Sequence, residues 1–221
     1  RPGGLYDPVT EHDACGVGFV ASIAGEKSHD IVRHGISVLE HLRHRGASGG
    51  DGATGDGAGI LLQIPDAFLR AECSHLGFAL PKSGHYGVGT LFMPHDRTVQ
   101  GRIRHVVEQI SGEEGLAFLG WREVPVNAAA IGEKARAERP AIFQCFMATG
   151  KPDPVALERR LYIIRKLISR RAAEATGAAD GVYVVSMSCR TIGYKGMMMG
   201  NELSSFYPDL DNPSFASACA W

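Results

Sequence analysis

Apolar and polar residues alternate with two different periods along the chain, and these periods predict a mixture of strands and helices. Apolar residues at every second position predict a strand over residues 15–23. Short apolar runs bounded by turn residues predict six further strands, over residues 60–64, 85–92, 116–126, 141–147, 182–189 and 191–197. The last eight residues, 214–221, are predicted to be extended.

A spacing close to 3.6 predicts three helices, over residues 28–45, 98–110 and 153–175. Gly46 suits the position just beyond the first helix, and Asp153 with Pro154 suits the start of the third. The chain has no internal repeat and no obvious interdomain linker. Short strands, long helices and hairpin-like pairs together predict a mixed, largely antiparallel α/β layered domain.

The composition of the chain argues against several classes of protein. The chain has 221 residues, 44% of them apolar, which is enough for a hydrophobic core. Its net charge of −1 argues against a dedicated nucleic-acid binder. No apolar run approaches the ~18 residues needed to span a membrane, and no signal-peptide core is present. Five scattered cysteines without a CxxC pair indicate a reduced compartment, so we expect a cytoplasmic protein.

Glycine is over-represented, and seven of the 28 glycines lie in residues 46–59. Residues 50–55 match G-x-G-x-x-G, but a helix precedes this loop and a strand follows, the reverse of a dinucleotide site. The loop also lacks the acidic alternation of a calcium-binding EF-hand. His41 and His44 are three residues apart, but no paired cysteine or H-E-x-x-H accompanies them. We therefore expect a structural loop and no metal site.

Cys15 has two interpretations. A cysteine at the start of a strand is most often a buried side chain. Alternatively, removal of the polar segment before it would make Cys15 an N-terminal nucleophile, with its own α-amino group as general base. The thiolate would then attack an amide or ester carbonyl.

An ordered set of motifs gives the chain a specific resemblance. The motifs are LYDP (5–8), EHDACGVGF (11–19), HRG (44–46), TGDGAGI (54–60), GWREVP (120–125), LYIIR (161–165), YKGM (194–197) and FYPDL (206–210). Together they resemble the start of the glutamate synthase large subunit, a class II glutamine amidotransferase (glutaminase) domain. The resemblance covers essentially the whole chain.

The resemblance implies the fold of N-terminal nucleophile hydrolases, a four-layer αββα sandwich of mostly antiparallel sheets, here expected to be incomplete. Residues 1–14 would be a leader, and residues 15–221 the N-terminal portion of the domain. Because the family's later arginine and Asn-Gly segments would lie beyond Trp221, we expect the isolated chain to be inactive.

The implied reaction is hydrolysis of the glutamine side-chain amide through a thioester on Cys15, which yields glutamate and ammonia for transfer to 2-oxoglutarate. The resemblance gives Gly16 and Arg45 supporting roles. It places Gly46, Asp56 and Gly57 in a loop near the site.

The implied partners are glutamine, downstream synthase domains of the same polypeptide, and either a small subunit or ferredoxin, with no nucleic acid and no membrane. No cofactor is expected in this segment. FMN and an iron–sulfur cluster would belong to the synthase domains. Two alternatives stay open: another N-terminal-cysteine amidase, or a non-catalytic docking module that uses the basic residues of 159–171.

Overall fold

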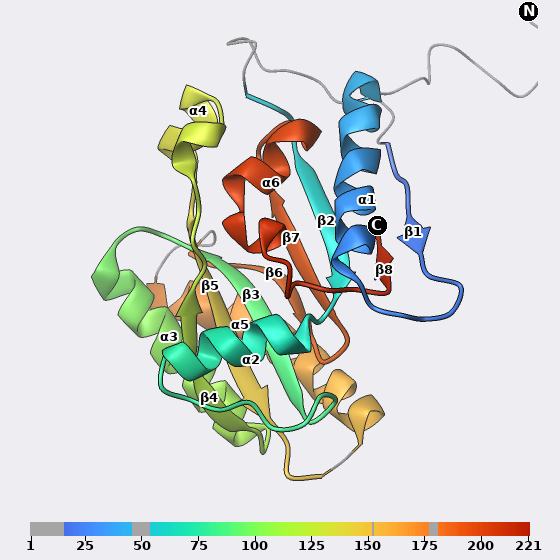
Figure 1. The fold of residues 1–221 in the computed structure, drawn as a ribbon. Coiled ribbons are helices and arrows are strands. Elements are labelled where there is room, and N and C mark those ends of the chain that lie inside the picture. The colour runs from blue at the N-terminus through green and yellow to red at the C-terminus, as the bar shows by residue number, and fades with distance from the viewer. Residues whose placement is uncertain (1–15, 46–53, 152, 177–180) are drawn as a thin grey trace, which may run out of the picture.

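Two antiparallel sheets form the centre of the molecule (Figure 1). The computed structural model describes residues 16–45, 54–151, 153–176 and 181–221. The first sheet has the strand order β1-β8-β2-β7 and consists of β1 (Val20–Ala21), β8 (Cys219–Ala220), β2 (Ala58–Gln63) and β7 (Thr191–Gly196). The second sheet has the order β4-β5-β3-β6 and consists of β4 (Ala117–Glu123), β5 (Ala141–Ala148), β3 (Tyr86–Met93) and β6 (Tyr183–Ser188). The predicted α+β class with mostly antiparallel sheets is confirmed.

Two long helices, α3 (Arg97–Glu113) and α5 (Pro154–Thr176), cover one face of the second sheet. Asp96 begins α3, because its carboxylate accepts hydrogen bonds from the backbone N–H groups of Thr98 and Val99. Each helix turns a stripe of aliphatic side chains onto the sheet. The buried members of these stripes are Ile103, Val107, Ile110, Leu157, Leu161, Ile164 and Ile168. Fully burying one such side chain contributes roughly 1.5–3 kcal/mol.

A second core lies between the two sheets and the remaining helices. These are α1 (His29–His41), which continues as a 3-10 turn η2 (Leu42–Arg45), then α2 (Asp66–His75), α4 (Glu133–Glu138) and α6 (Leu203–Phe206). Short 3-10 turns complete the chain: η3 (Ala128–Ala130), η4 (Gly200–Glu202) and η5 (Pro208–Asp211). In Figure 1, α1 lies along the first sheet and α2 crosses the second. Helices therefore cover both faces of the second sheet and one face of the first.

The hairpin formed by β6 and β7 joins the two sheets, because β6 pairs in the second sheet and β7 in the first. Its turn is fastened to α5: the backbone N–H and the thiol of Cys189 both donate to Oε2 of Glu158, at 2.9 and 3.0 Å. The sequence predicted these adjacent strands and their tight connection. It did not predict that they belong to different sheets.

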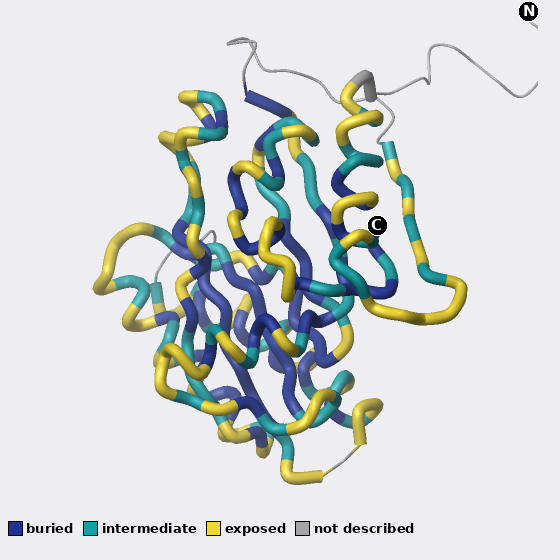
Figure 2. The backbone as a smooth tube through the Cα atoms, viewed as in Figure 1, coloured by how far each residue is buried: buried dark blue, intermediate teal, exposed yellow. Residues whose placement is uncertain are grey.

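The predicted first strand, residues 15–23, is shorter in the structure, where only Val20 and Ala21 pair with β8. Val17 and Phe19 are 79% and 77% exposed, and Figure 2 shows this segment at the outer edge of the molecule. The exposure of residues 16–23 does alternate. Val17 and Phe19, however, lie on the side of the first sheet that α1 does not cover, so they face solvent. The short helices α2, α4 and α6 were not predicted, because their residues show no clear 3.6-residue period.

Candidate functional site

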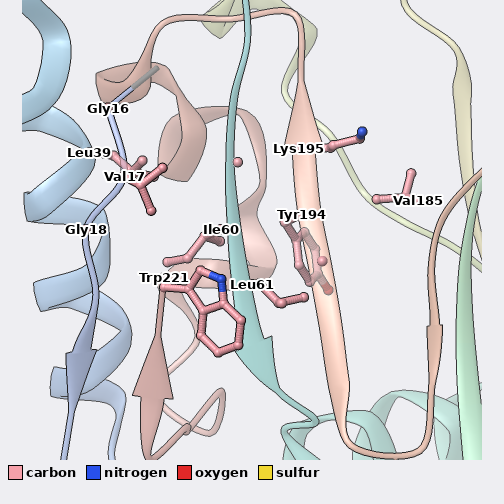
Figure 3. Close-up of a pocket in the computed structure, with 12 residues that line it drawn as sticks. Gly16, Val17, Gly18, Leu39, Ile60, Leu61, Val185, Tyr194, Lys195 and Trp221 are labelled. Carbon is pink, nitrogen blue, oxygen red and sulfur yellow. The ribbon is translucent and has the colours of Figure 1, made fainter. Parts of the chain in front are cut away.

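A cavity of about 320 Å³ opens beside the first sheet, next to the position where the candidate nucleophile joins the described chain. Gly16, Val17 and Gly18, which lead into β1, form one wall, and residues of β2 and β7 form the other (Figure 3). Trp221 lies between these walls. We call this space the glycine-walled cavity.

The two strands of the second wall, β2 and β7, approach closely because glycine occupies a position where a side chain would collide. A Cβ placed on Gly59 of β2 would lie 2.6 Å from the Cβ of Lys195, its partner on β7. Lys195 is the only charged residue among the described residues that line this cavity. The space therefore combines exposed backbone with one positive charge.

A second cavity, of about 430 Å³, adjoins the first and shares Gly59 and Lys195 with it. Asp56 and Gly57 line it, at the point where the glycine-rich loop enters β2. Gly57 has a φ of +140°, a backbone conformation that residues with a Cβ rarely adopt. The Lys195 ammonium donates to the Tyr183 hydroxyl at 2.7 Å and lies 4.4 Å from the centre of its ring. These contacts hold the lysine at the boundary of the two cavities.

A buried polar network supports the wall of the glycine-walled cavity. The Arg122 guanidinium on β4 donates two hydrogen bonds to the Asp209 carboxylate, both 2.7 Å long. The same carboxylate accepts a hydrogen bond from the Tyr194 hydroxyl at 2.8 Å, and Gln144 donates to that hydroxyl at 3.1 Å. The Tyr194 residue lines the cavity. The network therefore ties this part of β7 to the second sheet.

The contacts within the network determine the protonation states of Arg122 and Tyr194. Burial and the nearby Asp209 charge raise the pKa of Tyr194 well above its usual value. Burial alone would lower the pKa of Arg122, but the hydrogen bonds and charge of Asp209 outweigh it and raise the pKa. Arg122 therefore stays charged and Tyr194 stays neutral near physiological pH.

Three of the described cysteines are poor candidates for a nucleophile. Burial raises the pKa of Cys73, Cys145 and Cys189 to about 12. For Cys189, the Glu158 carboxylate that accepts its thiol hydrogen bond raises the pKa further. Because the thiolate is the reactive form, these three side chains are inert near neutral pH.

The structure brings some of the predicted site residues together. Gly16 lines the glycine-walled cavity, while Asp56 and Gly57 line its neighbour. Arg45 ends the turn η2, but its side chain lies outside the described part of the structure. Cys15 and Gly46 lie outside the described residues altogether. The role of each of these residues stays a prediction.

Sequence reasoning did not assign Tyr194, Lys195 or the Arg122–Asp209 pair to the site. All four lie in motifs that carry the resemblance: GWREVP, YKGM and FYPDL. That signal was available, but these four residues come from three separate elements, and only the fold shows that they meet.

Within the described ranges, no group of three His, Cys, Asp or Glu side chains is placed to hold a metal ion. Of the two histidines considered as ligands, His41 contacts the Ser37 carbonyl oxygen through Nδ1, at 2.7 Å. The side chain of His44 is outside the described set. None of the described helices is long and apolar enough to cross a membrane.

Comparison with known proteins supplies the family. The sequence model of glutamine amidotransferases class-II matches residues 15–221. The chain is 42% identical to the large chain of glutamate synthase (NADPH) from Bacillus subtilis, over 98% of this chain and 14% of that protein. It is 40% identical to ferredoxin-dependent glutamate synthase 2, chloroplastic, from Arabidopsis thaliana, over 98% of this chain and 13% of that protein.

The large chain of glutamate synthase (NADPH) from Azospirillum brasilense is also 40% identical, over 96% of this chain and 14% of its own length. The chain thus spans about one seventh of the length of these relatives. The family match, in contrast, begins at Cys15 and extends through the last residue. The chain belongs to the class II glutamine amidotransferases.

Proposed function

We propose that this domain is the glutaminase of a glutamate synthase, that Cys15 is its nucleophile, and that glutamine binds in the glycine-walled cavity. The observation that carries the proposal is the position of Gly16: the residue bonded to Cys15 lines a cavity of about 320 Å³. The similarity to glutamate synthase large chains supports the choice of substrate.

The chemistry proceeds in two steps. The Cys15 thiolate attacks the side-chain carbonyl carbon of glutamine, the C–N bond breaks, and the nitrogen leaves as ammonia after it accepts a proton. Water then attacks the γ-glutamyl thioester, releases glutamate and returns the thiol. Removal of residues 1–14 would let the Cys15 α-amino group, with a pKa near ~8, act as the general base.

The environment of three other cysteines supports this choice. Cys73, Cys145 and Cys189 have pKa values of about 12, so they compete poorly for an electrophile near neutral pH. The family match also begins at Cys15. Arg45 and Gly16 are proposed to orient the reacting groups, and Gly46, Asp56 and Gly57 to shape the adjoining loop.

The test measures ammonia release from glutamine by the full-length protein and by its Cys15→Ser and Cys15→Ala variants. We expect both variants to lose at least ~10³-fold in activity, because a nucleophile variant removes the covalent route. A glutamine analogue with an electrophilic side chain should add one mass equivalent, located at Cys15 by peptide mapping.

Cys219→Ser is the matched control, because Cys219 is a partly buried cysteine in β8, two residues from Trp221. It should retain activity and labelling. Normal ammonia release by Cys15→Ala, or labelling at Cys219 instead, would overturn the proposal.

The rest of the proposed enzyme follows from the resemblance to the glutamate synthase family. The ammonia would pass to synthase domains of the same polypeptide, where FMN and an iron–sulfur cluster are proposed to support its addition to 2-oxoglutarate, with a small subunit or ferredoxin as partner. A cytoplasmic location is part of the same proposal. Inactivity of the 221 residues alone stays a prediction, and Cys15-dependent ammonia release by the isolated chain would contradict it.

A further inference from the structure

A third cavity, of about 310 Å³, lies on the other face of the second sheet from the Arg122 network. It opens between the first turns of α3 and the ends of β4 and β5, with Glu123 and Ala141 at those strand ends. Its lining is mainly polar, in contrast to the glycine-walled cavity. We call it the α3 cavity.

The α3 cavity contains an arginine, Arg104, that forms no ion pair with a described residue. The Arg104 guanidinium lies 4.5 Å from the centre of the Phe143 ring and 5.4 Å from that of Trp121. Its Nε is buried and has no hydrogen-bond partner among the described residues. No carboxylate of the described chain lies within 4 Å of its guanidinium nitrogens. A buried N–H without an acceptor is unfavourable, so this site gains by binding one.

The neighbouring groups favour an anion. Arg97, also without an ion-pair partner in the described ranges, lines the same cavity. Glu123 is the only acidic side chain among the described lining residues, so two arginines oppose one carboxylate. The Gln100 amide nitrogen donates one hydrogen to the Pro94 carbonyl and has a second available. The helix N-terminus contributes little, because Asp96 already accepts its N–H groups.

We propose that the α3 cavity binds a small oxyanion, a carboxylate or a phosphate, through the Arg104 guanidinium, with Arg97 as a second ligand and Glu123 as an opposing charge. Planar guanidinium groups suit such ligands because their N–H groups match paired oxygens. This inference is independent of the glutamine site, since it concerns the opposite face of the second sheet.

The test is titration of the full-length protein with inorganic phosphate and, separately, with glutarate, each to about 10 mM, which covers affinities into the millimolar range. Calorimetry in low salt should show saturable binding of at least one of them. Binding of phosphate alone identifies a phosphate site, whereas binding of glutarate alone, or of both, identifies a carboxylate site. Absence of saturable binding of either would overturn the proposal.

Three variants identify the site. Arg104→Gln should weaken binding by about tenfold or more, because it removes a charge-assisted contact. Glu123→Gln should strengthen binding a few-fold by removing the opposing charge. Arg102→Gln is the matched control, since Arg102 is an exposed arginine of the same helix that does not line the cavity.

Arg104→Gln and Glu123→Gln are expected to change the affinity in opposite directions, so the test does not depend on one variant. If Arg104→Gln does not fold, the gain expected from Glu123→Gln still tests the site. Equal weakening by Arg102→Gln and Arg104→Gln would mean general attraction to a basic surface and would overturn the proposal. Unchanged or weaker binding in Glu123→Gln would do the same.

Discussion

Arg122 and Arg104 lie on opposite faces of the second sheet, and each lies near an aromatic ring, but their partners differ. Arg122 is 5.3 Å from the centre of Phe68 and donates to Glu72, Gln144 and Asp209. Arg104 has aromatic rings beside it and an Nε without an acceptor among the described residues. Arg122 therefore has a structural role in the buried network, whereas Arg104 is available to bind a ligand in the α3 cavity. The difference lies in whether the fold supplies a carboxylate.

The largest expected effect comes from Arg122→Met. Removing the guanidinium leaves the buried Asp209 carboxylate without its cation, and breaking a buried pair in this way costs about 3–5 kcal/mol. Urea unfolding, monitored by circular dichroism, measures the loss. The double variant Arg122→Met, Asp209→Asn should recover part of it, because the unpaired charge is gone. An equally large loss in the double variant would contradict the assignment to charge pairing.

Tyr194→Phe should have the next largest effect. It removes the hydroxyl that links Asp209 to Gln144 and leaves the Gln144 amide without its acceptor. Leaving a buried polar group unpaired costs about 1–3 kcal/mol, again measurable by urea unfolding. Tyr162→Phe is the control, since Tyr162 is exposed on α5. Equal effects of the two substitutions would argue against the network.

Alkaline pH should weaken the same network. Burial raises the pKa of Tyr194 in the folded protein, whereas the unfolded chain has a tyrosine pKa near ~10. The stabilisation is therefore complete below pH ~10 and declines as pH rises further, because the unfolded chain releases its proton first. The free energy of unfolding should fall by up to about 1.4 kcal/mol per pH unit for this tyrosine. Tyr194→Phe should show a correspondingly shallower decline.

The smallest effect is expected when Arg104 is replaced by methionine, the same substitution as at Arg122. Arg104→Met should change the free energy of unfolding by less than about 1 kcal/mol, since it removes only the two cation–π contacts and retains apolar packing. The measurement is the same urea titration, beside Arg122→Met. A loss of several kcal/mol would show that Arg104 has a structural partner and would remove the contrast between the two arginines.

The sequence predicted most long elements, because their patterns are local. The positions of Ile103 and Ile110 on the apolar side of α3, and the start of α5 at Pro154, depend on patterns within a few residues. The edge strand β1 was predicted too long, since alternation does not reveal how many partners a strand finds. Pairing of Leu62 in β2 with Ala220 in β8 joins residues far apart in the chain and has no local signal.

The same limit applies to the site. The motif around Cys15 identified a candidate nucleophile, and Gly16 does line a cavity. In contrast, Arg122 and Asp209 are 87 residues apart and appear in the sequence as two unrelated charges. The sequence did not predict the α3 cavity either, because an arginine without an ion-pair partner cannot be distinguished from a paired one before the fold is known.

The hairpin of β6 and β7 has a consequence for how the molecule unfolds. Its two strands contribute to different cores, yet a turn of two residues, Cys189 and Arg190, is all that separates them. Because the turn is so short, separation of either strand from its sheet would also displace the other strand. The two sheets therefore cannot unfold independently. We therefore expect denaturation to occur in a single cooperative step, in spite of two sheets and two cores.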